Sequence, residues 1–106
     1  MAWILLLAAG LLEIVWAFTM KLSQGFTRLG PTLLTLLAML ASFGLLSIAM
    51  RSLPLGIAYT VWAGVGAVGS FVVGAIVLGE PLTTTRIIAA VLIVAGMILM
   101  KLSTQG

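Results

Sequence analysis

The sequence predicts an all-α membrane protein with four transmembrane helices, and three observations support this class. Of its 106 residues, 63% are hydrophobic and only 7% are charged, whereas a soluble domain needs a charged surface because most of its area faces water. The charges divide the chain into four apolar runs, and a helix needs roughly 20 residues to cross the hydrocarbon. The runs lack the alternation of a barrel strand, so helices must satisfy their backbone groups in lipid.

The apolar runs place the spans in order. We expect them at residues 2–20, 31–50, 54–78 and 86–103. Pro31 suits a helix start, where its missing N–H costs nothing, and Lys101 can snorkel to the interface, which lengthens the short last run. No Lys or Arg precedes the first run, so it lacks the basic start of a signal peptide, and we expect Glu13 to stay in the mature protein. The connections are too short to hold another domain, so residues 1–106 are predicted to form one.

Composition removes several classes of function. The chain has neither Cys nor His, so it lacks thiolate and imidazole metal ligands and the commonest general base. We therefore expect no enzyme, no cofactor and no metal site. The net charge of +3 and the pI near 10.3 would suggest nucleic acid for a soluble protein. Here the five cations are scattered over the ends of apolar runs and form no patch, so the expected partner is the lipid bilayer.

The balance of positive charge leaves the orientation open. With four spans, one side of the membrane carries Arg51 and Lys101, and the other carries Lys21, Arg28 and Arg86. Lys and Arg normally set orientation, but a difference of one residue sets it weakly. Such a chain could insert both ways up, and two opposite copies could pair as an antiparallel dimer. The alternative, that the small bias selects one orientation, stays open.

Glu13 is the chemically decisive residue, because it lies near the middle of the first apolar run. An ionised carboxylate at this depth costs at least ~2.5 kcal/mol, and such residues usually bind protons or cations, or pair with a base. No Lys or Arg lies at a similar depth in another run. The pattern therefore predicts a site for a proton and a cation. The alternative is a neutral, hydrogen-bonded glutamic acid that only holds helices together.

Helical spacing indicates what could surround Glu13. Residues three and four positions away share its face, among them Gly10, which admits a close helix, and Trp16, which offers an indole N–H and a π face for a cation. Three further side chains could complete a polar, aromatic-lined pocket: Ser42 in the second span, and Tyr59 and Trp62 in the third. Taken singly, each of these residues is more often a packing residue than a ligand.

The third span also contains the pattern G-x-G-x-x-G at Gly64, Gly66 and Gly69. A nucleotide-binding role is rejected, because no strand precedes the pattern and no acidic residue follows at the required distance. Small residues inside a span instead allow close helix approach and a local kink. We therefore predict a conformational hinge, which suits a transporter that opens alternately to two sides.

Three features of the sequence stand together: Glu13, KLSQGFTRL at residues 21–29 and LPLGIAYTVWAGVG at residues 53–66. By these features the sequence resembles, over essentially its full length, the small multidrug resistance family of proton-coupled exporters. It implies a four-helix subunit in a dual-topology antiparallel homodimer. It also implies that the two copies of Glu13 bind either protons or a cationic substrate, but not both at once.

Fewer residues indicate the subtype within this family. Trp16, Ser42 and Lys101 resemble the guanidinium exporters, whereas the multidrug subtype typically has Gly at the position of Trp16; Thr19 and Met20 resemble the multidrug subtype. The resemblance implies export of guanidinium or small guanidinyl cations in exchange for protons, across a bacterial inner (plasma) membrane. It also implies that Trp16, Ser42, Tyr59 and Trp62 arrange hydrogen bonds around Glu13. The alternatives are a multidrug exporter of quaternary ammonium and aromatic cations and, less expected, a non-transporting membrane subunit.

Overall fold

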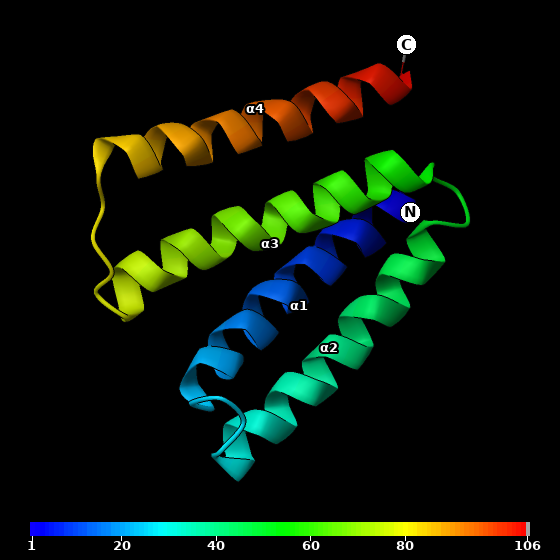
Figure 1. Cartoon of the computed structure of the whole chain (residues 1–106). Coiled ribbons are helices and arrows are strands. Elements are labelled where there is room, and N and C mark those ends of the chain that lie inside the picture. The colour runs from blue at the N-terminus through cyan, green and yellow to red at the C-terminus, as the bar shows by residue number, and fades with distance from the viewer. Residues whose placement is uncertain (106) are drawn as a thin grey trace.

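The computed structural model describes residues 1–105, which form four α-helices joined by short connections (Figure 1). These are α1 (Ala2–Leu22), α2 (Leu29–Ala49), α3 (Leu55–Val77) and α4 (Thr84–Gln105). Each contains an apolar stretch of 20 to 23 residues, long enough to cross the ~30 Å hydrocarbon core of a bilayer. The chain is a multi-pass membrane protein, and the predicted class with four spans is confirmed.

Two helix boundaries show how local sequence shapes the fold. α2 begins at Leu29, so Pro31 lies in its first turn, where the backbone N–H groups have no partner within the helix. α3 ends at Val77 because Gly79 adopts a left-handed conformation, with φ of +70°. This turn brings the N–H of Glu80 back to the carbonyl of Gly74, at 3.0 Å.

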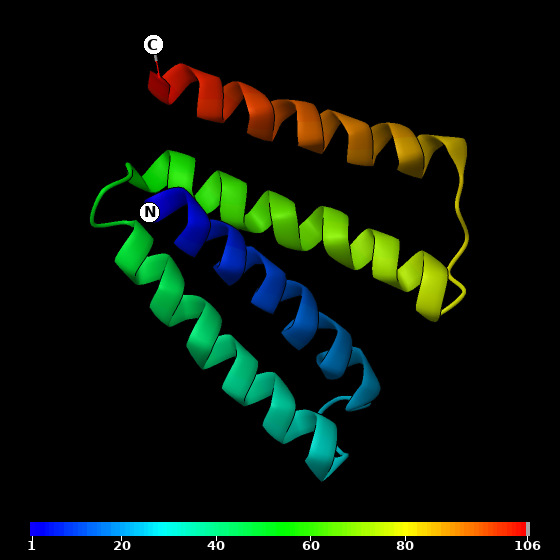
Figure 2. The ribbon, with the colours of Figure 1, turned by 180° about the vertical axis from the view of Figure 1, so that it is seen from behind.

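The helices form a single layer in the order α2, α1, α3, α4 (Figures 1 and 2). α1 packs against both α2 and α3, whereas the backbone of α4 approaches only that of α3. The layer measures 46 × 34 × 16 Å, and its small apolar core lies where the first three helices meet: Leu6, Ala9, Leu46, Ala49, Ala58 and Trp62. The start of α1, the end of α4 and the α2–α3 connection lie at one end of the layer, and the other two connections lie at the opposite end.

α4 stands at the edge of this layer. No residue in the apolar stretch of its span is buried within the chain. Its contact with α3 passes through Gly64, where an added Cβ would lie against the side chains of Met97 and Ile93. One subunit therefore leaves most of α4 facing outward.

Candidate functional site

The carboxyl group of Glu13 lies in the contact between α1 and α3. A Cβ atom on Gly66 would overlap with Oε1, Cδ and Cγ of Glu13, so this position of the carboxyl requires a residue without a side chain. Oε1 is buried, and within residues 1–105 it has no hydrogen-bond partner. Leaving a buried polar atom unpaired costs about 1–3 kcal/mol, which makes this atom a candidate for binding a ligand.

Glycines on both helices let α1 and α3 approach closely around Glu13. Gly10 lies against Val65, one turn before the carboxyl, and Gly69 lies against Ile14. Gly64 differs from the other two glycines of its motif because it faces α4. α3 is a continuous helix through all three, so their contribution in this conformation is close packing, and the hinge stays a prediction.

Ser42 connects the three core helices by hydrogen bonds. Its hydroxyl donates to the backbone carbonyl of Ala9 on α1, at 2.7 Å, and accepts from Nε1 of Trp62 on α3, at 3.0 Å. Ser42 is fully buried and Trp62 is only 7% exposed. This pair holds α2 and α3 in register with α1 one turn before Glu13.

An aromatic cluster extends from Trp62 along the three helices. The ring centroids of Trp62 lie 5.4 Å from Tyr59 and 5.9 Å from Phe43, and Phe43 in turn lies 6.3 Å from Trp16 in an edge contact. Tyr59 is 53% exposed, so it stands at the outer border of the cluster. Phe43 thus links Trp16 to the Trp62–Tyr59 pair, and these three are the aromatic residues predicted for the site.

Trp16 carries the second unpaired polar atom of the site. Its Nε1 is buried and has no hydrogen-bond partner in the part of the chain that the structure describes. A buried acceptor, Oε1 of Glu13, and a buried donor thus lie one turn apart on α1. Within that part of the chain, no hydrogen bond joins Glu13 to Ser42, Tyr59 or Trp62.

Comparison with known proteins places these features in a family. The model of the Small Multidrug Resistance protein family matches residues 1–94. The chain belongs to the small multidrug resistance family. It is 54% identical over 105 residues to the guanidinium exporters of Citrobacter freundii and Salmonella typhimurium, and 53% identical over 104 residues to that of Yersinia pestis. These alignments cover 98–99% of this chain and the full length of each relative. The chain is therefore a transporter and not an enzyme.

Two features of this member of the small multidrug resistance family were missed at the sequence level. Phe43, which bridges Trp16 and Trp62, is apolar, and the only signal for it was its mid-span position beside Ser42. The other feature is a buried contact of 2.6 Å between the hydroxyls of Thr19 and Thr35, which links α1 to α2. Hydroxyl groups within otherwise apolar runs were the available signal for this pair.

Within the described residues, no three side chains of the types that usually bind metals gather into one group. The candidate site itself offers one carboxyl group, one indole N–H and the aromatic surfaces around them. These groups can exchange a proton, accept hydrogen bonds from a small cation and contact its face.

Proposed function

We propose that this chain is a proton-coupled antiporter that exports guanidinium or small guanidinyl cations. The observation that carries the proposal is the buried, unpaired Oε1 of Glu13 in the middle of a membrane-spanning helix, one turn from the unpaired Nε1 of Trp16. A carboxyl group there is expensive unless it binds a proton or a cation.

The chemistry of guanidinium suits this arrangement. It is a planar cation with N–H donors in one plane, and carboxylates bind such groups through short, charge-assisted hydrogen bonds. Aromatic rings within ~6 Å of a cation add cation–π attraction, and the cluster from Trp16 to Tyr59 offers such rings. The names of the relatives, guanidinium exporters, support this substrate.

Proton coupling follows from having one carboxyl group with two competing ligands. In a low-dielectric setting the group must be neutralised, either by its own proton or by a bound cation. Binding of guanidinium therefore releases a proton, and a proton gradient can drive the cation the other way. In a bacterial inner membrane, this exchange exports the cation as protons enter. The named relatives come from bacteria.

We further propose that an antiparallel homodimer carries out transport by this mechanism. The subunit is a layer only 16 Å thick, little more than one helix diameter of about 10–12 Å, and α4 buries nothing of its apolar span. A second copy would cover such a layer. The even distribution of Lys and Arg between the two sides allows that copy to be inverted, and Glu13 of each copy would then share one site.

The position of Thr19 weakens the case for the multidrug alternative. The hydroxyl of Thr19 contacts Thr35 on α2, so it serves the packing of α1 against α2. Trp16 puts a large side chain where the multidrug subtype typically has Gly. Both features favour a small planar substrate over a bulky aromatic one.

The test is radiolabelled guanidinium uptake into proteoliposomes under an imposed pH gradient. We expect uptake by the wild-type chain, no coupled uptake by Glu13→Gln, and reduced uptake by Glu13→Asp, which keeps a carboxyl group. Size-exclusion chromatography checks that the variants keep the oligomeric state of the wild type. Full coupled uptake by Glu13→Gln would overturn the mechanism. Preferred uptake of a bulky aromatic cation would instead support the multidrug alternative.

A further inference from the structure

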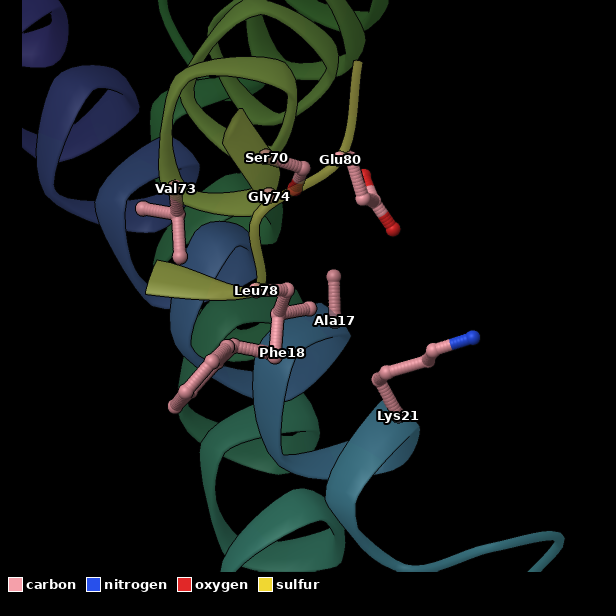
Figure 3. Close-up of a pocket in the computed structure, with 8 residues that line it drawn as sticks. All are labelled: Ala17, Phe18, Lys21, Ser70, Val73, Gly74, Leu78 and Glu80. Carbon is pink, nitrogen blue, oxygen red and sulfur yellow. The ribbon is translucent and has the colours of Figure 1, made fainter. Parts of the chain in front are cut away.

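A pocket of about 170 Å³ opens near the ends of α1 and α3 that carry the α1–α2 and α3–α4 connections (Figure 3). It is distinct from the site of Glu13 and contains the only other acidic residue of the chain, Glu80. Its lining also includes Ser70 and Lys21. The mechanism proposed above uses none of these three residues.

The pocket lies on the same helix faces as Glu13. On α1, Ala17 and Lys21 follow Glu13 at spacings of four residues, and on α3, Ser70 and Gly74 follow Gly66 at the same spacing. Residues four apart share one face of a helix, at ~6 Å along its axis. Since Glu13 lies against Gly66, the pocket continues the α1–α3 contact from the carboxyl toward the end of the layer. It begins about one turn beyond Glu13.

The backbone holds the carboxylate of Glu80 at this pocket. The left-handed Gly79 turns the chain back, and the N–H of Glu80 donates to the carbonyl of Gly74. A Cβ on Gly74 would overlap with Oε1 of Glu80, so the side chain lies directly over that glycine. Figure 3 shows Lys21 and Glu80 extending toward the same open side of the pocket, with Ala17 between them. Both side chains belong to exposed residues.

We propose that this pocket is an outer binding site for small cations that carry N–H donors, on the route between the membrane surface and Glu13. This inference rests on the proposed function. The Glu80 carboxylate and the Ser70 hydroxyl would accept hydrogen bonds from the cation, while Lys21 is the resident positive charge with which it competes. In an inverted pair of subunits, each side of the membrane presents one such site.

A charge at the entrance acts mainly on capture of the substrate. An opposite charge raises the local concentration of a cation, and salt screens this effect over a Debye length of ~8 Å at physiological ionic strength. We therefore expect Glu80→Gln to raise the KM for guanidinium by about two- to fivefold at low salt, the upper part of the range for exposed charge pairs. The kcat should stay near the wild-type value, and the KM difference should shrink in high salt.

Matched charge variants test whether the effect on the KM comes from the pocket or from the electrostatic field of the whole protein. Lys21→Gln and Arg28→Gln each remove one positive charge from the same end of the helix layer, beside the α1–α2 connection. Only Lys21 lines the pocket. We expect Lys21→Gln to lower the KM and Arg28→Gln to leave it within about 1.5-fold. Glu80→Asp, which keeps the charge, should stay closer to wild type than Glu80→Gln. Equal effects of Lys21→Gln and Arg28→Gln, or an unchanged KM in Glu80→Gln, would overturn the outer site.

Direct binding gives a readout that does not depend on transport. In a Glu13→Gln background, guanidinium chloride is titrated while amide NMR signals are followed. We expect shifts confined to the pocket, at Ala17, Ser70 and Gly74, and loss of these shifts in Glu13→Gln/Glu80→Gln. Shifts that persist in the double variant, or that are absent in the single one, would contradict the outer site. Neither result would affect the role of Glu13, whereas a wild-type chain without guanidinium uptake would remove the proposed function itself.

Discussion

The contacts of α1 with its two neighbours differ in how they treat buried polar atoms. Toward α2, Ser42 bonds to the carbonyl of Ala9, and Thr19 contacts Thr35. Toward α3, Oε1 of Glu13 lies against a glycine with no partner in the described chain. The polar atoms of these two α1–α2 contacts are thus paired within the subunit, whereas the α1–α3 contact keeps an unpaired acceptor that can bind a ligand.

The two contacts therefore have different tasks. An interhelical hydrogen bond in a membrane contributes about 0.6 kcal/mol on average, and several together fix one geometry. The α1–α3 contact depends instead on small residues, which let two helix backbones approach closely. We infer that α1 and α2 form the stable part of the subunit, and that the α1–α3 contact is the place where ligands and conformation change together.

The strongest test of this difference is Gly66→Ala. The new Cβ would displace the flexible end of Glu13, so the fold should survive while the carboxyl moves. A misplacement of about 1 Å at a reacting group can cost ~100-fold, and we expect a loss of guanidinium uptake of this order. Gly44→Ala is the matched control, because a Cβ at Gly44 meets nothing within 4 Å. Unchanged uptake in Gly66→Ala would show that the Glu13 position in the structure is not the working one.

The unpaired indole of Trp16 predicts the next largest effect. Trp16→Phe keeps an aromatic ring and removes the N–H. The indole N–H cannot bond to guanidinium, which carries only N–H donors, but it can donate to the ionised carboxylate of Glu13 that holds the cation. A hydrogen bond to a charged group contributes about 1.5–3 kcal/mol, so we expect the KM for guanidinium to rise at least about tenfold. Trp3→Phe, at the start of α1, is the control and should leave the KM unchanged. If Trp16→Phe transports like wild type, the indole N–H has no part in binding, and its unpaired state needs another explanation.

Much of the fold could be predicted from the sequence, because charges separate the spans and lipid permits little besides helices. The prominence of Glu13 was predictable for the same reason: one carboxyl group in an apolar run stands out. The order of the helices in the layer could not be predicted, because α1 and α3 are apolar on nearly all sides and the sequence pattern does not indicate which helices touch.

The site was predicted as a set of residues but not as a set of bonds. Ser42 and Trp62 were both candidates for contact with Glu13, whereas the structure bonds them to each other. Helix register decides this, and register depends on packing of whole surfaces. The pocket at Glu80 was also beyond the sequence, because it depends on the turn at Gly79 that brings a loop residue back over α3.

Ser42→Ala should have a smaller effect, divided between stability and transport. The substitution leaves Nε1 of Trp62 without its acceptor, and an orphaned buried donor costs about 1–3 kcal/mol. We expect destabilisation in this range, measured by unfolding in mixed micelles, and about a threefold rise in the KM as Trp62 loses its fixed position. Ser47→Ala, at an exposed position of the same helix, should change neither. A double-mutant cycle with Trp62→Phe should give a coupling of about 0.6–1.7 kcal/mol, and no coupling would contradict the bond.

The smallest expected effect comes from the Thr19–Thr35 contact, and its small size is informative. Each hydroxyl also has a local acceptor, the carbonyl of Trp16 for Thr19 and that of Pro31 for Thr35. Since each hydroxyl has one proton, one of the two donates across the contact while the other donates locally, so removal of one leaves the other partly satisfied. We expect Thr19→Val to lower the free energy of unfolding by about 0.5 kcal/mol. The double variant Thr19→Val/Thr35→Val should lower it by less than the sum of the two single variants. The ratio of guanidinium to aromatic cation transport should not change in either variant. A shift of that ratio toward aromatic cations would mean that Thr19 faces the substrate in the working dimer, so that the satisfied contact with α2 also takes part in selecting the cation.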